Sequence, residues 1–250
     1  MSSSSSSSSS STTTTTKINF SDFDIALFDL DETLIRSDHV WDMVGDIWIK
    51  RHGLPTVTPQ QLVDHGWSES VGFFDGAQIV MNALGLKEPE YTAKAVGKEW
   101  IKIGEECYVD PNEVPLIAGA RDFLEALRSA GVKMAVVTSN CVDLTEKVLA
   151  VHGIGEFFSV IVTSDMAERP KPFPDPYIMA LRKLGVSGDD FSRVIVFEDS
   201  MQNGKSVMAT GMKVCGIYSA VKSAVKKWPE YSKAANFVVK ETYDEINPNK

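Results

Sequence analysis

Cysteine is scarce in this 250-residue sequence. The three cysteines are Cys107, Cys141 and Cys215, and none has the paired spacing of a structural zinc site. An odd number of cysteines in a chain of this length is typical of a reducing compartment rather than of a disulfide framework. The sequence therefore predicts a protein without disulfide bonds and without structural zinc.

Long apolar runs and long basic runs are also missing. No apolar stretch approaches the roughly 18 residues needed to cross a bilayer, and the N-terminus lacks the basic start and apolar block of a signal peptide. The net charge is −9, and no basic run exceeds two residues, so broad attraction to nucleic acid or anionic lipid is not expected. We expect a cytoplasmic monomer with no nucleic-acid and no membrane partner.

Residues 2–16 contain only Ser and Thr. Such a polar tract buries too little apolar surface to offset the entropy of ordering, so we expect residues 1–16 to be a disordered tail.

After this tract, short apolar runs rich in β-branched residues recur along the chain. Such runs are typical of strands that are buried on both faces of a parallel sheet. Helical patterns that end at glycine lie between some of them. The alternation predicts a doubly wound, Rossmann-like α/β core. The expected strands are 24–30, 132–138, 160–163, 193–198, 213–217 and 237–240, and the expected helices are 120–131, 141–153 and 176–185, the last with Asp175 as its N-cap.

Residues 37–116 interrupt this alternation. They show helical spacing at 41–51, 70–85 and 91–107, without a convincing strand. We expect an all-helical cap domain inserted after the first strand, with the catalytic core formed by residues 17–36 and 117–250. Its edges fall near Ser37 and in the loop 109–119, whose two prolines and terminal glycine suit a hinge.

Carboxylates follow two of the expected strands. The first strand ends in Asp29 and Asp31, and the fourth ends in Glu198 and Asp199. Ligands gather at the carboxyl ends of parallel strands, and side chains two residues apart lean to the same side. Oxygen ligands without Cys or His indicate a hard cation, Mg²⁺ above all. A single acid after a strand is commonly a helix N-cap, which explains one of these sites easily and three converging ones poorly.

Polar side chains and a lysine are expected near the same edge of the sheet. The second strand ends in Thr138, Ser139 and Asn140, where hydroxyls and free N–H groups at the opening of a helix form a cradle for phosphate. These residue types are also ordinary helix caps. Lys171 lies between two prolines, which favours an extended, stiff backbone, although a solvated loop lysine is the simpler interpretation of that residue alone.

The charges of these groups do not balance. Four carboxylates bring four negative charges, whereas Mg²⁺ and Lys171 return three, so one carboxyl group is expected to share or hold a proton. That is the condition for a general acid.

Four motifs in order resemble those of the haloacid dehalogenase-like superfamily of phosphatases and phosphomutases. They are DLDET (29–33), VVTSN (136–140), KPFPDPY (171–177) and VIVFEDS (194–200). The resemblance spans roughly residues 24–218, and it is closest to the branch that holds β-phosphoglucomutase, phosphoglycolate phosphatase and sugar-phosphate phosphatases. It implies a Mg²⁺-dependent phosphatase acting on a small phosphomonoester of a sugar, polyol, nucleoside or glycolate.

The resemblance also implies a role for each motif position. Asp29 would be the nucleophile that forms an aspartyl-phosphate. Asp31 would protonate the leaving oxygen and later deprotonate the attacking water. The helical insert would close over the site and select the substrate. The implied phosphate-binding residues are Thr138, Ser139, Asn140 and Lys171, with Thr138 and Lys171 holding the phosphoryl oxygens, and the implied metal-binding residues are Asp29, Asp31, Asp199 and Glu198, the last acting directly or through a water.

Glu32 departs from the family pattern, since many relatives have glycine at this position. A positive φ at this turn would strain a glutamate. We therefore expect ordinary backbone geometry there.

The main alternative is a phosphomutase of the β-phosphoglucomutase kind. Such an enzyme holds a second phosphate, for which relatives place an arginine in a cap loop similar to residues 64–70. The matching position is Glu69, which would repel that phosphate, although Arg51 or Lys50 could substitute.

Three other functions are disfavoured. A dehalogenase does not require the acid/base group at Asp31, and a binding protein on an inactive fold predicts the loss of a reactive group, none of which is missing. A nucleotide-binding loop at 204–206 is rejected because the required glycine is replaced by Asp199.

The sequence does not determine which residues select the substrate. His65, Trp67 and Phe73 or Phe74 lie in the cap loop region and could contact the leaving group. Aromatic residues at helical spacing are more often part of a core, so both interpretations stand.

Overall fold

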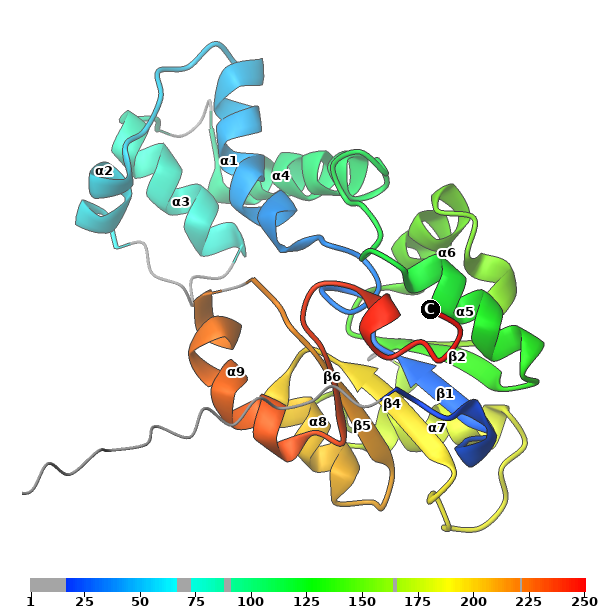
Figure 1. The fold of residues 1–250 in the computed structure, drawn as a ribbon. Coiled ribbons are helices and arrows are strands. Elements are labelled where there is room, and N and C mark those ends of the chain that lie inside the picture. The colour runs from blue at the N-terminus through cyan, green and yellow to red at the C-terminus, as the bar shows by residue number, and fades with distance from the viewer. Residues whose placement is uncertain (1–16, 67–72, 88–90, 164–165, 221) are drawn as a thin grey trace, which may run out of the picture.

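The computed structural model describes residues 17–66, 73–87, 91–163, 166–220 and 222–250, and the expected disordered tail at 1–16 lies outside them (Figure 1). Six strands form one parallel sheet in the order β3-β2-β1-β4-β5-β6. This order is that of a doubly wound Rossmann-like sheet, so the predicted fold class is confirmed. The strands are β1 (Ile25–Phe28), β2 (Lys133–Thr138), β3 (Val160–Thr163), β4 (Val194–Glu198), β5 (Lys213–Ile217) and β6 (Phe237–Val239).

Both faces of the sheet are covered, which explains why the strands consist of continuous apolar runs. In β1, Ala26 and Phe28 join one hydrophobic cluster, whereas Ile25 and Leu27 join the other, because successive side chains alternate between faces. Helices α5 (Ala120–Ser129) and α6 (Val142–Val151) cover the first face. Helices α7 (Asp175–Lys183), α8 (Met201–Met208) and α9 (Lys222–Ala234) cover the second (Figure 1).

Aromatic packing joins the two central strands of the sheet. The rings of Phe28 in β1 and Phe197 in β4 stack with centroids 4.3 Å apart, and Phe123 of α5 packs edge-on against Phe197 at 5.4 Å. All three side chains are fully buried. Such pairs contribute about 0.5–1.5 kcal/mol beyond their burial, so they stabilise the strands whose ends carry the acidic residues.

Among the described residues between β1 and α5, all the named elements are helices, as predicted. They are α1 (Asp38–Arg51), α2 (Pro59–Asp64), α3 (Phe73–Leu84) and α4 (Ala93–Tyr108). Helices α1, α3 and α4 share a hydrophobic cluster that includes Trp48, Val80 and Trp100. The short helix α2 was not predicted, although its capping box at Thr58 and Gln61 is a recognisable signal.

The two chain segments that connect this helical insert to the sheet run side by side. Ile35 forms an antiparallel bridge with Leu116, and the N–H of Arg36 donates to the carbonyl of Pro115 at 2.9 Å. The second connection ends at Gly119, whose φ is 75°. A side chain there would meet Thr242 Oγ1 at 2.8 Å, so both the backbone and the space require glycine.

Two local predictions about helix starts were wrong. Helix α7 begins at Asp175 itself, with Pro174 at the N-cap position. The Asp175 carboxylate instead accepts hydrogen bonds from Arg169 at 2.8 and 3.0 Å. Helix α6 begins at Val142 with Cys141 as its N-cap, so Thr138, the last residue of β2, and Ser139 precede the helix and do not open it.

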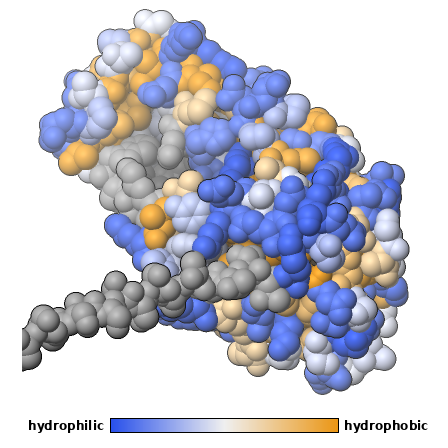
Figure 2. All heavy atoms as spheres, viewed as in Figure 1, coloured by the Kyte–Doolittle hydropathy of each residue, from blue (hydrophilic) through white to orange (hydrophobic). Residues whose placement is uncertain are grey.

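In the part of the chain that the structure describes, the remaining regular elements include the short 3₁₀ helices η1 (Phe20–Asp22), η2 (Gly155–Phe157) and η4 (Tyr243–Glu245). Among the described residues, no helix has the length and apolar character of a membrane span. On the face seen in Figure 2, apolar residues are interspersed with hydrophilic ones on both the helical insert and the sheet domain.

Candidate active site

Three neighbouring strands carry the acidic and hydroxyl residues at their carboxyl ends. Asp29 follows β1, Thr138 ends β2 and Glu198 ends β4. The N–H of Asp29 donates to the carbonyl of Phe197 at 3.0 Å, which continues the pairing of β1 with β4 by one residue. The central position of β1 between β2 and β4 therefore brings these three side chains to one edge of the sheet.

Lys171 reaches this edge from the segment between β3 and α7. Its Nζ lies 2.6 Å from Asp29 Oδ1 and 2.8 Å from Glu198 Oε1, and its side chain is only 4% exposed. The peptide bond between Lys171 and Pro172 is cis. Burial acts to lower the pKa of Lys171, but the attraction of Asp29 and Glu198 outweighs it and raises that pKa above the ordinary value. Lys171 is thus a permanent cation in the site.

Asp29 is held from two sides. Its Oδ1 accepts from Lys171, and its Oδ2 accepts from the Thr33 hydroxyl at 3.1 Å. Burial raises the pKa of Asp29 to about 7, and the negative charges of Glu198 and Asp31 act in the same direction against the attraction of Lys171. The ionised carboxylate is therefore fixed in position but needs further positive charge nearby.

Glu198 is fully buried and fully hydrogen-bonded. Its Oε1 accepts from Lys171 at 2.8 Å, from the Tyr177 hydroxyl at 2.6 Å and from Asn203 Nδ2 at 2.9 Å. Its Oε2 accepts from the N–H of Ser200 at 2.8 Å. A buried carboxylate with these four donors is suited to orient Lys171, and its charge adds to the field at Asp29.

Asp31 is positioned by residues of the helical insert. The Ser37 hydroxyl and the Tyr108 hydroxyl each donate to Asp31 Oδ1 at 2.6 Å. Burial raises the pKa of Asp31, and the hydrogen bonds from Ser37 and Tyr108 only partly oppose this effect. A raised pKa is what an acid that donates a proton near neutral pH requires.

The carboxylates of Asp29, Glu198 and Asp199 each offer an oxygen, and these oxygens all lie within 4.8 Å of one another. Burial raises the pKa of Asp199 well above its ordinary value, and the charges of Glu198 and Asp29 raise it further. Oxygen donors alone and an excess of negative charge fit a hard divalent cation such as Mg²⁺. The structure thus brings together acids that lie about 170 positions apart in the sequence.

The predicted phosphate-binding residues of the second motif lie at the end of β2 and in the loop that leads to α6. Thr138 is fully buried and its Oγ1 accepts from the N–H of Asn140 at 3.0 Å, whereas Ser139 is exposed. Asn140 Oδ1 accepts from the N–H of Cys141 at 2.9 Å. Phosphate binding by Thr138, Ser139, Asn140 and Lys171 stays a prediction.

The sequence interpretation missed five residues of the site. Tyr177 and Asn203 contact Glu198, Thr33 contacts Asp29, and Ser37 and Tyr108 contact Asp31. Thr33 and Tyr177 lie inside the quoted motifs, so a signal for them was present. Tyr108 ends a cap helix 77 positions from Asp31, and no local pattern indicates that contact.

The expectation of ordinary backbone geometry at Glu32 was wrong, because its φ is 54°. Glu32 is only 4% exposed, and the contacts of its buried carboxylate explain how the turn tolerates this φ value. Its carboxylate accepts from the N–H groups of Ser37 at 2.9 Å and Asp38 at 3.2 Å, and from Arg36 Nη1 at 2.9 Å. These contacts offset the roughly 1–2 kcal/mol that a left-handed conformation costs a residue with a Cβ.

The residues proposed for substrate selection are only partly described. His65 is exposed, and its Nδ1 lies 2.7 Å from the carbonyl of Gln61. Trp67 and Glu69 lie outside the described residues, as do the side chains of Phe73 and Phe74. Of the two basic residues weighed as a substitute for the mutase arginine, Arg51 pairs with Glu106 at 2.8 Å and Lys50 is exposed.

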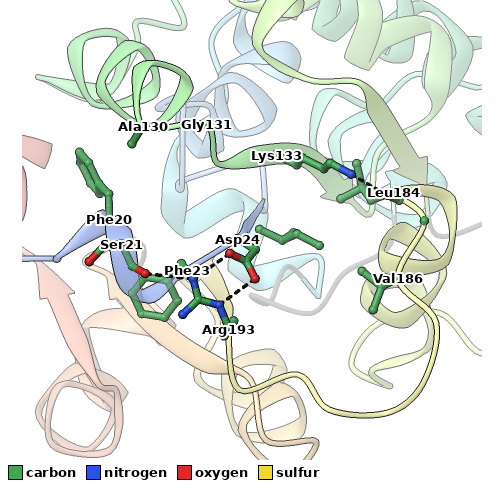
Figure 3. Close-up of a pocket in the computed structure, with 12 residues that line it drawn as sticks. Phe20, Ser21, Phe23, Asp24, Ala130, Gly131, Lys133, Leu184, Val186 and Arg193 are labelled. Atoms are coloured by element: carbon green, nitrogen blue, oxygen red, sulfur yellow. Dashed lines mark hydrogen bonds and ion pairs between the residues drawn. The ribbon is translucent and has the colours of Figure 1, made fainter.

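Two hollows are relevant to the location of the site. One of about 420 Å³ lies at the amino ends of the strands, opposite the acidic residues, where Arg193 pairs with Asp24 and Lys133 donates to the carbonyl of Leu184 (Figure 3). Its cations are therefore engaged within the protein. A second, of about 260 Å³, borders Asp199 itself and belongs to the edge that carries the acids.

Comparison with known proteins agrees with this geometry. The family model for haloacid dehalogenase-like hydrolases matches residues 26–217. The N-acetylmuramic acid 6-phosphate phosphatase of Pseudomonas aeruginosa is 28% identical over 193 residues, which cover 77% of this chain and 80% of that protein. Hexitol phosphatase A of Escherichia coli is 27% identical over 195 residues, with 76% and 81% covered.

A solved structure shares the fold. The crystal structure of a candidate β-phosphoglucomutase from Thermotoga maritima matches with a TM-score of 0.69 at 22% identity, and the match covers 88% of this chain and 95% of that one. The chain belongs to the haloacid dehalogenase-like hydrolases. The named phosphatases among its relatives assign it to the phosphoric monoester hydrolases.

Proposed function

We propose that this protein is a Mg²⁺-dependent phosphatase that hydrolyses a small phosphomonoester through an aspartyl-phosphate on Asp29. The observation that carries the proposal is the position of Asp29, whose buried carboxylate lies between Lys171, 2.6 Å away, and the acids Glu198 and Asp199. A carboxylate that is oriented, close to a cation and part of an oxygen-only ligand set is suited to attack phosphorus.

In the first step, a bond forms between an Asp29 oxygen and phosphorus as the bond between phosphorus and the ester oxygen breaks. Asp31 gives its proton to that leaving oxygen, consistent with its raised pKa. In the second step, water attacks phosphorus, Asp31 takes a proton from the water, and the bond between Asp29 and phosphorus breaks. Phosphate is released and Asp29 is restored.

The positive charge around the phosphoryl group has two proposed sources. Lys171 and the Thr138 hydroxyl would hold phosphoryl oxygens, with Ser139 and Asn140 beside them. Asp29, the main-chain carbonyl of Asp31 and Asp199 would hold Mg²⁺, with Glu198 acting directly or through a water; the four donors already on Glu198 favour the indirect role. When bound, the cation would neutralise charge on the phosphoryl oxygens.

We assign residues 37–116 to the cap domain, and residues 17–36 and 117–250 to the catalytic domain. The separate hydrophobic cluster of α1, α3 and α4 and the paired connections at Ile35 and Leu116 support these boundaries. A cap that closes over Asp29 would exclude bulk water, which would otherwise compete for the reactive groups.

The substrate class proposed is a sugar or polyol phosphate. Two relatives have alignments that cover about three quarters of this chain. According to their names, they act on N-acetylmuramic acid 6-phosphate and on hexitol phosphates. Nucleoside phosphates and phosphoglycolate are further candidate substrates and belong in the same assay. The cytoplasmic location and the monomeric state expected from the sequence stay predictions, the second of which gel filtration would test.

The decisive experiment measures phosphate release with Mg²⁺ from 4-nitrophenyl phosphate and from a panel of sugar and polyol phosphates, compared by kcat/KM. Asp29→Asn is expected to lower turnover by about 1000-fold or more while the circular dichroism spectrum is unchanged. Asp189→Asn, at an exposed acid, serves as the matched control. Turnover retained by Asp29→Asn would contradict the assignment of the nucleophile.

The mutase alternative is tested on the same protein. Incubation with β-glucose 1-phosphate and its bisphosphate is expected to release free phosphate without forming the 6-phosphate isomer. Accumulation of that isomer would identify a phosphomutase instead.

A further inference from the structure

We propose that Tyr108 is a positioning residue that fixes which oxygen of Asp31 carries the catalytic proton. The proposal rests on the acid/base role of Asp31 given above. Tyr108 is the last residue of α4, and its side chain is fully buried. Its hydroxyl lies 2.6 Å from Asp31 Oδ1, although 77 positions separate the two residues.

The direction of this hydrogen bond follows from the chemistry of the two groups. Burial and the charge of Asp31 raise the pKa of Tyr108, so its hydroxyl keeps its hydrogen. A carboxylate oxygen accepts, and the Tyr108 hydroxyl therefore donates to Asp31 Oδ1.

A second hydroxyl contacts the same oxygen of Asp31. Ser37 Oγ lies 2.6 Å from Asp31 Oδ1, so both donors from the cap connections converge on Oδ1. Among the described residues, no side chain donates to Oδ2 of Asp31. An oxygen that already accepts two hydrogen bonds has little room for a proton, so the acid form of Asp31 carries its proton on Oδ2.

This arrangement has a consequence for both chemical steps. The proton on Oδ2 passes to the leaving ester oxygen as the bond between phosphorus and that oxygen breaks. The ionised Oδ2 then takes a proton from the water that attacks phosphorus, which restores the acid form. Tyr108 keeps Oδ1 as a permanent acceptor throughout, so the same oxygen serves both transfers.

The packing of Tyr108 allows its hydroxyl to be tested separately from its ring. The ring belongs to the hydrophobic cluster of the sheet domain, together with Phe123 and Leu34. Tyr108→Phe preserves that packing and removes the hydroxyl that donates to Asp31. The expected loss is therefore one of proton transfer rather than of folding.

The experiment compares two esters that differ in their need for an acid. An alkyl phosphate such as a hexitol phosphate leaves as a poor alkoxide unless it is protonated, whereas 4-nitrophenyl phosphate leaves as a stable phenolate. For Tyr108→Phe we expect kcat/KM to fall about 10- to 100-fold for the alkyl ester and less than about 3-fold for the aryl ester, within the range of general acid catalysis. Equal losses for both esters, or no loss for either, would overturn the proposal.

Two controls separate this result from a general defect. Tyr243→Phe also removes a buried tyrosine hydroxyl, one that donates to the carbonyl of Thr33 at 2.9 Å, and should leave the ratio of the two rates unchanged. Asp31→Asn should also lower kcat/KM more for the alkyl ester than for the aryl ester, and by a larger factor than Tyr108→Phe.

The outcomes also distinguish this proposal from the proposed function. If the wild-type protein hydrolyses both esters and Asp31→Asn loses the alkyl ester selectively, the acid role stands whatever Tyr108→Phe does. If Tyr108→Phe melts too low to assay, Ser37→Ala is the second variant, because it removes the other hydroxyl that donates to Oδ1 of Asp31. It should shift the ratio in the same direction, and an unchanged ratio would again overturn the proposal.

Discussion

The Nζ of Lys171 lies 2.6 Å from Oδ1 of Asp29, and the lysine side chain is 4% exposed. A cation removed from water in this way is stable only because two carboxylates face it, the second being Glu198 at 2.8 Å. The pair gives Asp29 a fixed orientation at the end of β1. It also leaves the other carboxylates of the site without a matching charge among the described residues, which is the electrostatic reason to expect a divalent cation.

Replacing Lys171 by methionine is expected to reduce both stability and activity. The variant keeps most of the side-chain volume but leaves Asp29 and Glu198 without their shared cation, and breaking a buried pair costs about 3–5 kcal/mol. Turnover should fall by about 100-fold or more, because a donor to the phosphoryl oxygens is lost. Urea unfolding and phosphate release measure the two effects.

Lys147→Met is the matched control for this change. Lys147 pairs with Asp143, but the two side chains are 59% and 80% exposed, so the loss of stability should be far smaller than that of Lys171→Met. A stability of Lys171→Met equal to that of Lys147→Met would show that the buried pair contributes nothing.

Mg²⁺ is expected to stabilise the folded protein through Asp199. At a concentration 100 times its Kd, the cation should add about 2.7 kcal/mol to the free energy of unfolding, or about 5–10 °C in Tm. Asp199→Asn should abolish this shift, and a chelator should abolish turnover of the wild-type protein. Differential scanning calorimetry with and without Mg²⁺ checks the prediction, and a shift of the same size in Asp199→Asn would exclude Asp199 as a ligand.

Glu32→Gly is expected to destabilise the protein even though it relieves backbone strain. Glycine removes the roughly 1–2 kcal/mol cost of the positive φ. It also removes a buried carboxylate that accepts from Ser37, Asp38 and Arg36, where each hydrogen bond to a charged group contributes about 1.5–3 kcal/mol. The net loss should be about 3 kcal/mol or more by urea unfolding.

Glu32→Gln separates the two contributions to this result. It keeps the backbone conformation and most of the acceptor geometry but loses the charge opposite Arg36, so we expect a stability between that of the wild type and Glu32→Gly. A glycine variant more stable than the wild type would mean that strain outweighs the contacts.

His152 is expected to make the protein less stable in mild acid. Its side chain is buried, and its Nε2 has no hydrogen-bond partner among the residues that the structure describes. Burial lowers the pKa of His152 below 6.5, and the charge of Arg121 lowers it further. The unfolded state therefore binds more protons between the two pKa values, so the free energy of unfolding falls as the pH drops below about 7, by at most about 1.4 kcal/mol per pH unit.

Nuclear magnetic resonance titration of the His152 ring and urea unfolding between pH 5 and pH 8 test this prediction. His152→Gln should show a weaker dependence of stability on pH than the wild type. A His152 titration midpoint at or above the ordinary value would contradict the assignment.

Much of the candidate site could be predicted from the order of residues. Asp29, Asp31, Glu198 and Asp199 each follow an apolar run, and ligands gather where such runs end in a parallel sheet. The helical insert could be predicted as well, because its apolar spacing changes from continuous runs to helical periodicity.

Two predictions failed because a side chain binds a partner four to six residues away, which a rule about a single position does not include. Glu32 adopts a positive φ because Ser37, Asp38 and Arg36 compensate it, and a local rule about strain does not contain those contacts. Asp175 was expected to cap α7, but Arg169 occupies its carboxylate.

Local composition and periodicity, which act over a few residues, were enough to determine the strands and the types of reactive group in this protein, and most of its helices, but not α2, α8 and α9. Only the tertiary structure decided that Tyr108 contacts Asp31, that Tyr177 contacts Glu198, and that Lys171 lies between two acids. The physical reason is that hydrogen bonds and ion pairs of buried groups depend on distances in space, which are set by how the sheet and the helices pack.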